Sequence, residues 1–299
     1  MRDKAMGVIG YGEVGKIFAA GLLGKDGVAR VSAWDLKFAQ ADARQAGIGH
    51  AGKAGIAITP SMRALCEISD WLISAVTASN TLSVAREAAS CMRPGALFLD
   101  LNSASPGTKQ QCAALIEAAG AHYVEAGVMT SVPPYGIKVP MLLGGAKAAQ
   151  VAQTLNAWGM DAKAVSERIG VASATKMCRS VMIKGLEALV IESYATARHY
   201  GVEDAMLATL AETFPGIDWP KQGAYFFSRV AQHGKRRAEE MAEAANTVRE
   251  AGFDPFMAAA IAEKHDWMAQ QARTGAFNDL PKDAVWQDYA DRLSALKSQ

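Results

Sequence analysis

The chain has 299 residues, of which 50% are hydrophobic, and its 31 Lys and Arg against 30 Asp and Glu give a net charge of +1. This composition excludes a largely disordered chain, and the absence of a basic tract argues against a nucleic-acid-binding protein. No apolar run approaches the roughly 18 residues that span a bilayer, and the N-terminus lacks the pattern of a signal peptide, so we expect neither a membrane protein nor a secreted one.

The four cysteines are widely spaced and form neither a CxxC pair nor a Cys/His cluster. They are Cys66, Cys91, Cys112 and Cys178. This pattern argues against a metal site or a disulfide framework and favours a reduced, cytoplasmic compartment.

In the first half of the chain, short β-like runs alternate with helical runs. Strands are expected at Ala5–Ile9, Arg30–Trp34, Ile56–Ile58, Trp71–Ala75, Leu97–Asp100, His122–Glu125, Val139–Gly144 and Ala162–Val165. Helices are expected at Val14–Leu23, Lys37–Ala46, Ser79–Cys91, Thr108–Ala119 and Ala146–Trp158, and the glycine-rich stretch Gly47–Gly55 is expected to be a loop. This alternation predicts an α/β fold, a Rossmann-type doubly wound parallel sheet with helices on both faces.

The pattern changes after about residue 166, because β-like alternation then disappears. One long helix is expected over Ile169–His199. Further helices are expected at Glu203–Thr213, Ala224–Gln232, Lys235–Ala251, Pro255–Arg273 and Ala284–Leu296. The sequence therefore predicts two domains, an α/β domain at 1–166 and an all-helical domain at 167–299.

A G-x-G-x-x-G motif follows the first expected strand and opens the first expected helix. It consists of Gly10, Tyr11, Gly12, Glu13, Val14 and Gly15. In this context the first glycine permits a tight turn, the second lets the backbone approach a pyrophosphate, and the third lets helix and strand pack closely. The motif predicts dinucleotide binding, with the phosphates at the helix N-terminus.

Asp35 follows the second expected strand, about 20 residues past the last glycine of the motif, where an acid hydrogen-bonds the ribose 2′-OH. The alternative for Asp35 is a solvated cap of the next helix. A carboxylate there repels a 2′-phosphate, so NAD is favoured as the cofactor, while the nearby Lys37 keeps NADP possible. Val76 and Thr77 follow another strand end and are expected to lie beneath the adenosine. Asn102 is expected at the nicotinamide end, with a turn or N-cap role as the alternative.

Three further segments occur in an order that is typical of one enzyme family: Asp100–Pro106, Glu125–Val128, and Lys176 on the long helix. With these segments the chain resembles the β-hydroxyacid dehydrogenases, which include 3-hydroxyisobutyrate dehydrogenase and 6-phosphogluconate dehydrogenase. It looks most like a branch with a distinct 6-phosphogluconate-dehydrogenase-like helical C-terminal domain. The resemblance implies an NAD(P)-binding domain followed by a substrate and dimerisation domain.

The resemblance also implies roles for single residues. Lys176 matches the catalytic lysine, and Ser180 stands where the family has asparagine. Met129 stands where the family has serine, so Thr130 and Ser131 are expected to contact the substrate instead. A hydroxy acid also needs a clamp for its carboxylate, for which an arginine offers a bidentate fork. The residues expected to contact the substrate are Ser103, Thr130, Ser131, Arg236 and Arg237.

Helical spacing gives a separate argument for Lys176, because it lies on one face with Ser173, Ser180, Lys184 and Glu187. Such a polar stripe on a mostly apolar helix indicates a wet cleft, and an ordinary solvated face is the alternative. A lysine accepts a proton only when it is uncharged, and burial together with a neighbouring cation lowers the pKa of a lysine.

The function expected is hydride transfer between a nicotinamide cofactor and a small β-hydroxy acid or sugar acid. The alternatives are an oxidative decarboxylase or isomerase of a sugar acid, an imine reductase, and a non-catalytic dinucleotide-binding protein. Imine reductases commonly have another residue in place of the lysine, so Lys176 argues against that alternative. A homodimer through the helical domain is also expected.

Overall fold

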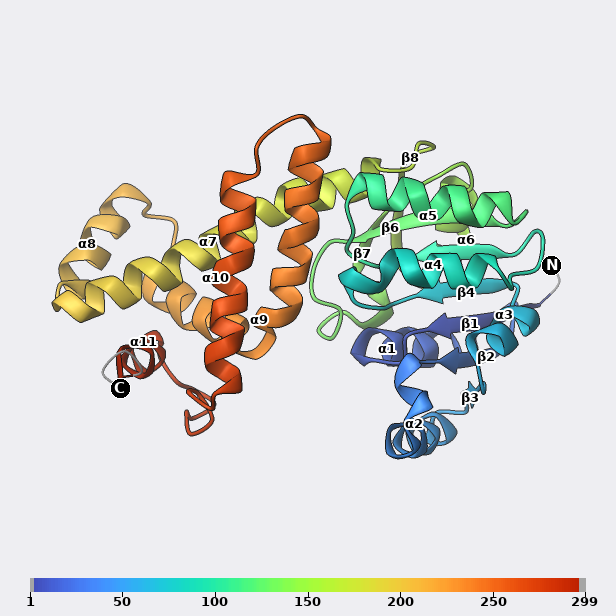
Figure 1. The fold of residues 1–299 in the computed structure, drawn as a ribbon, viewed down its shortest axis with the longest axis horizontal. Coiled ribbons are helices and arrows are strands. Elements are labelled where there is room, and N and C mark those ends of the chain that lie inside the picture. Colours follow the sequence, from blue (N-terminus) through green and yellow to red (C-terminus); the bar gives the residue numbers. More distant parts are fainter. Residues whose placement is uncertain (1–2, 296–299) are drawn as a thin grey trace. The chain divides into compact units, whose positions relative to one another are not determined.

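The computed structural model describes residues 3–295, which form two compact units (Figure 1). The first unit ends at Met177 and the second begins at Cys178. The division falls inside the helix α7, Val171–Tyr200, which starts in the first unit.

The described part of the first unit contains an eight-stranded sheet with the order β3-β2-β1-β4-β5-β6-β7-β8. The strands are β1 Lys4–Ile9, β2 Val28–Trp34, β3 Ala57–Ile58, β4 Trp71–Ser74, β5 Leu97–Asp100, β6 His122–Val128, β7 Pro140–Gly144 and β8 Asp161–Ser166. Strands β1 to β6 are parallel, which confirms the predicted fold class, whereas β7 is antiparallel to β6 and β8 is parallel to β7.

Successive residues of the central strands point alternately into two hydrophobic clusters, one on each face of the sheet. Ile73 and Leu99 belong to one cluster, and their neighbours Leu72 and Phe98 belong to the other. The first cluster is covered by α1 Glu13–Leu22 and α6 Ala148–Ala157, and the second by α3 Met62–Ile68, α4 Thr81–Ala89 and α5 Pro106–Ala118. This arrangement leaves the carboxyl ends of β1, β4 and β5 at one edge of the sheet, on either side of the point where the strand order reverses.

The predicted loop at Gly47–Gly55 is wrong, because α2 spans Ala41–Lys53. It follows the short helix η1, Leu36–Ala39. A Cβ on Gly47 would lie 2.3 Å from the ring of Phe38, so this glycine lets the helix pack closely. Two other short helical turns are η2, Ala78–Asn80, and η3, Gly136–Lys138.

The second unit is helical, as predicted, and its helices after α7 are α8 Glu203–Thr213, α9 Trp219–Glu250, α10 Phe256–Arg273 and α11 Trp286–Ala295. The predicted break between Gln232 and Lys235 is wrong, because α9 is continuous there. A Cβ on Gly234 would lie 2.7 Å from the carbonyl oxygen of His265, so the glycine permits close packing against α10 and does not end the helix.

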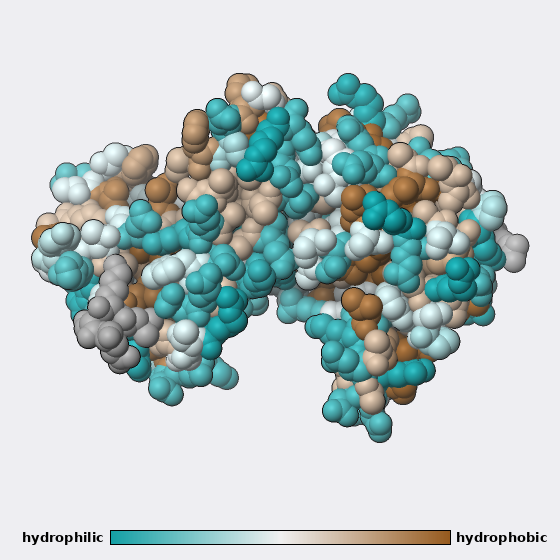
Figure 2. Space-filling view, in the orientation of Figure 1, coloured by the Kyte–Doolittle hydropathy of each residue, from teal (hydrophilic) through white to brown (hydrophobic). Residues whose placement is uncertain are grey.

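The surface is mixed in character. On the face drawn in Figure 2, hydrophobic residues are scattered among hydrophilic ones. Among the described residues, no helix combines the length and the hydropathy needed to cross a membrane.

Candidate active site

The glycine motif forms a tight turn between β1 and α1. Gly10 has a φ of +90°, and a Cβ there would lie 2.5 Å from the carbonyl oxygen of Ala75. A Cβ on Gly15 would lie 1.8 Å from the carbonyl oxygen of Gly10, so only glycine fits at either position. The tight turn predicted at Gly10 and the close packing predicted at Gly15 are therefore both present in the structure.

Gly12 differs from its two neighbours in the motif because it is exposed and faces open space. A Cβ there would meet no heavy atom within 4 Å, and Gly12 is the N-cap of α1 without a side-chain hydrogen bond. The first amides of α1, which include those of Glu13 and Val14, are therefore directed to a position that an anionic group can approach. These residues fit a dinucleotide pyrophosphate.

Asp35 lies at the carboxyl end of β2 and connects it to the glycine turn. Its Oδ2 accepts a hydrogen bond from the Tyr11 amide at 2.7 Å, and its Oδ1 accepts one from the Lys37 amide at 2.9 Å. The Tyr11 hydroxyl contacts His50 Nδ1 at 3.1 Å, and burial raises the pKa of this tyrosine. A carboxylate oxygen has more than one lone pair, so Asp35 retains acceptor capacity beside the turn.

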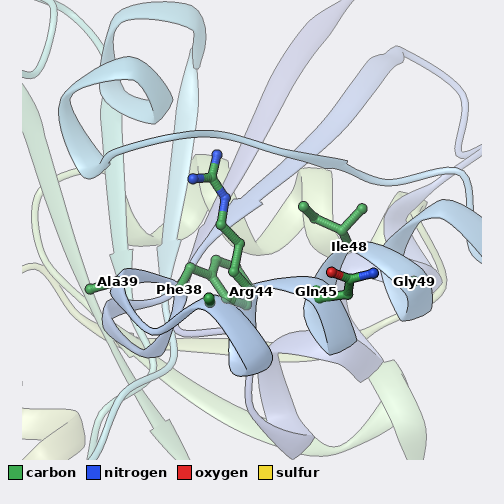
Figure 3. Close-up of a pocket in the computed structure, with 7 residues that line it drawn as sticks. Phe38, Ala39, Arg44, Gln45, Ile48 and Gly49 are labelled. Atoms are coloured by element: carbon green, nitrogen blue, oxygen red, sulfur yellow. The ribbon is translucent and has the colours of Figure 1, made fainter.

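The elements η1 and α2, which follow Asp35 in the sequence, carry a surface hollow (Figure 3). Its lining residues are Phe38, Ala39, Ala41, Arg44, Gln45, Ile48 and Gly49. Arg44 and Ile48 project to the same side of α2 in Figure 3. None of the residues that line this hollow belongs to the glycine motif.

Asn102 joins the ends of β4 and β5. Its Nδ2 donates to Ser74 Oγ at 2.9 Å, and its Oδ1 accepts from the Val76 amide at 2.7 Å. Both ends of the side-chain amide are thus bound to protein, while Thr77, next to Val76, is exposed. Asn102 therefore holds the ends of β4 and β5 together. The sequence analysis predicts that this residue contacts the nicotinamide end of the cofactor.

Lys176 contacts Ser103, which lies in the loop after the carboxyl end of β5. Its Nζ donates a hydrogen bond to Ser103 Oγ at 2.5 Å, although the two residues are 73 positions apart in the chain. Both are half-buried. Thr130 and Ser131 follow the carboxyl end of β6, where Thr130 is exposed and Ser131 half-buried. The structure therefore brings Lys176 to Ser103, just beyond the end of β5.

The start of α7 is held by Glu125 of β6, which sequence reasoning missed as a helix cap. Its fully buried carboxylate accepts hydrogen bonds from the amides of Gly170 at 2.7 Å, Ala172 at 3.1 Å and Ser173 at 3.3 Å. A signal was present in the sequence, because Gly170 precedes the helix without a side chain that could cap it. Such a helix start needs an acceptor from elsewhere in the chain.

Gly127 allows α7 to approach β6 closely. A Cβ on Gly127 would lie 3.0 Å from the carbonyl oxygen of Ala172 and 3.5 Å from Lys176 Cβ. Together, the Glu125 cap and Gly127 fix the height and the rotation of the helical turn that carries Lys176.

In the second unit, Ser180 lies beside an ion pair between the buried Lys184 and the half-buried Glu240. Lys184 Nζ donates to Ser180 Oγ at 3.3 Å and lies 3.0 Å from Glu240 Oε2. Arg236 Nε lies 3.9 Å from the other carboxylate oxygen of Glu240, and this arginine is half-buried. Ser180 is thus an acceptor for a lysine within its own helix.

Arg237 is buried against Glu187, to which its guanidinium donates through both Nε and a terminal nitrogen. His265 lies 3.8 Å from the same carboxylate and is fully buried. Burial first, and then the positive charges of Arg237 and Lys184, lower the pKa of His265 to about 3. This histidine is therefore neutral in the native protein at neutral pH.

Comparison with known families gives two matches along the chain. Residues 5–165 match the family described as the NAD binding domain of 6-phosphogluconate dehydrogenase. Residues 197–268 match a domain of unknown function (DUF1932).

Similar proteins cover most of the chain. A conserved hypothetical protein from Sinorhizobium meliloti 1021 is 37% identical, with 99% of this chain and 97% of that chain covered and a TM-score of 0.76. A conserved protein of unknown function, whose structure is described as similar to 3-hydroxyacid dehydrogenases, is 29% identical, with 90% and 98% covered and a TM-score of 0.68. An uncharacterised 28.5 kDa protein of Methanothermus fervidus is 28% identical over 214 residues, which are 69% of this chain and 79% of that protein.

The Mycobacterium tuberculosis 3-hydroxyisobutyrate dehydrogenase has a TM-score of 0.71 over 97% of this chain and 99% of its own. It is only 15% identical, so this likeness shows a shared fold.

Proposed function

We propose, from the premise that this chain belongs to the family of the NAD binding domain of 6-phosphogluconate dehydrogenase, that it is an NAD(P)-dependent oxidoreductase. Its substrate in this proposal is a small β-hydroxy acid or sugar acid, and Lys176 is its general acid and base. The membership confirms the resemblance seen in the sequence and the nicotinamide dinucleotide as cofactor.

One observation supports the role of Lys176 above all others, namely its hydrogen bond to Ser103 within the first unit. Ser103 follows β5, whose carboxyl end lies at the same edge of the sheet as the glycine turn after β1. In doubly wound sheets this edge is where ligands bind. The Lys176 amine and the glycine turn proposed to bind the phosphates thus both lie in the first unit, at the side of the sheet where the parallel strands end.

The bound nicotinamide supplies the hydride chemistry, and the chain positions the reactants and moves the proton. When the substrate hydroxyl is oxidised, an uncharged Lys176 amine accepts its proton, and in the reverse direction the ammonium form returns it. Ser103 Oγ accepts a hydrogen bond from this nitrogen and so fixes its direction. A positioned proton-transfer group of this kind contributes about 10²- to 10⁴-fold in rate.

The finer assignments are parts of the same proposal. Asp35 favours NAD over NADP, and Thr130 and Ser131 offer hydroxyl and amide groups to a substrate carboxylate. The contacts expected of Ser180, Arg236 and Arg237 with the substrate stay predictions. In the second unit, the guanidinium of Arg237 is already held by Glu187.

The proposal includes a homodimer in the cytoplasm. Large apolar side chains of the second unit are exposed, among them Met182 and Leu189 on α7 and Phe256 on α10. All four cysteines, each within the described residues, are free, which suits a reduced compartment. Light scattering is expected to give twice the 31.6 kDa of one chain, and a monomer at micromolar concentration contradicts this part.

The reaction class is tested with purified protein, by following NADH or NADPH absorbance with a panel of short-chain 3-hydroxy acids, aldonates and their keto forms. Turnover of at least one hydroxy acid, with NAD preferred, is the expected result. Release of CO2 along with the reduced cofactor instead indicates an oxidative decarboxylase. Reduction of cyclic imines alone indicates an imine reductase, and cofactor binding without turnover of any compound indicates a non-catalytic protein.

A further inference from the structure

A buried polar cluster lies at the carboxyl end of β5, below the loop that carries Ser103. Its centre is Asp100, which is fully buried. Lys109 of α5 places its Nζ 2.9 Å from Asp100 Oδ1 and 3.2 Å from the Asp100 carbonyl oxygen. The hydroxyl of Tyr123 on β6 donates to Asp100 Oδ2 at 2.7 Å. Two neighbouring elements thus hold one carboxylate.

The same carboxylate is bound directly to the loop. The Asn102 amide donates to Asp100 Oδ1 at 2.9 Å, and the Asn102 side chain connects this loop to the end of β4. The next residue, Ser103, accepts the hydrogen bond of Lys176. A continuous series of contacts therefore leads from Tyr123 and Lys109 through Asp100 to the amine.

Tyr123 is fixed in place as a donor. Its ring is stacked on Phe98 at a centroid distance of 6.0 Å and an interplanar angle of 12°. Burial first, and then the Asp100 carboxylate, raise the pKa of Tyr123 well above its ordinary value. The hydroxyl therefore keeps its proton throughout the pH range in which a dehydrogenase works, and Asp100 has a permanent donor on that side.

A buried Lys–Asp pair is poor evidence of stabilisation, because apolar side chains of similar volume often replace such pairs without loss. The cluster suits a different purpose, since each donor orients a carboxylate that in turn orients the loop. We propose that Asp100, Lys109 and Tyr123 are positioning residues, which hold the loop after β5 so that Ser103 Oγ keeps the Lys176 amine in place. The kinetic consequence rests on the proposed function, whereas the positional claim does not.

The test uses Tyr123→Phe, which removes a single hydroxyl, and Tyr194→Phe as its matched control. Tyr194 is also buried, and its hydroxyl donates to the Trp219 carbonyl oxygen at 3.1 Å in the second unit. Ser103→Ala serves as the reference for complete loss of the acceptor. The reporter is the side-chain ε-carbon NMR resonance of Lys176 in 13C-lysine-labelled full-length protein, assigned by its disappearance in Lys176→Met.

Tyr123→Phe is expected to move the Lys176 resonance in the same direction as Ser103→Ala and by a smaller amount, while Tyr194→Phe leaves it in place. Where a substrate has been found, Tyr123→Phe is also expected to lower kcat about 3- to 10-fold, the value of one hydrogen bond, with the KM for NAD unchanged. A folded Tyr123→Phe protein with an unchanged Lys176 resonance overturns the inference. A resonance that moves in a protein without turnover supports the positional claim and counts against the proposed function alone.

Discussion

Replacing Glu125 by glutamine is expected to loosen the start of α7 severely, although the two side chains have nearly the same shape. The carboxylate accepts three backbone amides and is fully buried, so solvent does not screen it. Hydrogen bonds to a charged group contribute about 1.5–3 kcal/mol each, and neutral ones about 1 kcal/mol. Glutamine keeps one oxygen, weakens the bonds from Gly170 and Ala172, and turns an amide group toward the Ser173 amide.

At the lower end of these ranges, the loss of one charged hydrogen bond, about 1.5 kcal/mol, and the weakening of two others, about 0.5 kcal/mol each, sum to about 2.5 kcal/mol. Because 1.4 kcal/mol is a factor of ten, the Ser173 amide is expected to exchange its hydrogen roughly 10²-fold faster than in the wild type. Native-state hydrogen exchange followed by mass spectrometry measures this directly. A lower kcat is expected as well, since Lys176 lies on the next turn of α7.

Asp218→Asn is the matched control, because it makes the same change of carboxylate to amide at the start of α9. Asp218 is exposed and accepts one amide, from Lys221 at 3.1 Å. Aspartate and asparagine are about equally favourable as N-cap residues, so the exchange rate of the Lys221 amide is expected to change little. Unchanged exchange at Ser173 in Glu125→Gln would refute the view that this carboxylate holds α7.

Two further predictions concern the cofactor and the pH dependence of stability. Asp35→Ala is expected to weaken NAD binding about 10-fold or more without weakening NADP binding, as measured by fluorescence titration, and a wild type that already prefers NADP contradicts the role of Asp35. Because the pKa of His265 is about 3 in the native protein, against 6.5 ordinarily, only the unfolded chain binds this proton between these values, so stability falls as the pH is lowered through that window. From pH 7 to pH 5 the free energy of unfolding, measured with urea, is expected to fall by about 2 kcal/mol. This loss is expected to disappear in His265→Gln and to remain in His122→Gln, which changes an exposed histidine. Equal pH dependence in the wild type and both variants contradicts the prediction.

Elements with clear local signals were predictable from the sequence. The strand Leu97–Asp100 and the helix Glu203–Thr213 begin and end where they were expected, because apolar alternation and helical spacing mark them. Two of the errors have one cause. Gly47 and Gly234 were read as breaks, whereas each lies within a helix and makes room for a packed neighbour. Only the tertiary structure shows what a glycine faces.

The glycine turn and its backbone constraints were also predictable, since the motif lies within 6 successive residues. The residues that hold Lys176 in place were not predictable, because they act through contacts between distant positions of the chain. Glu125 lies 45 positions before Gly170, and Tyr123 lies 23 positions after Asp100. No spacing rule connects such pairs, so the sequence predicted the lysine without the residues that hold it.

The most direct test of the proposed chemistry compares cofactor binding and turnover in Lys176→Ala and in Lys163→Ala, which changes an exposed lysine of β8. With a substrate identified, Lys176→Ala is expected to bind NAD as tightly as the wild type and to turn over about 10²- to 10⁴-fold more slowly, while Lys163→Ala keeps full activity. Turnover in Lys176→Ala within about threefold of the wild type would contradict proton transfer by this amine.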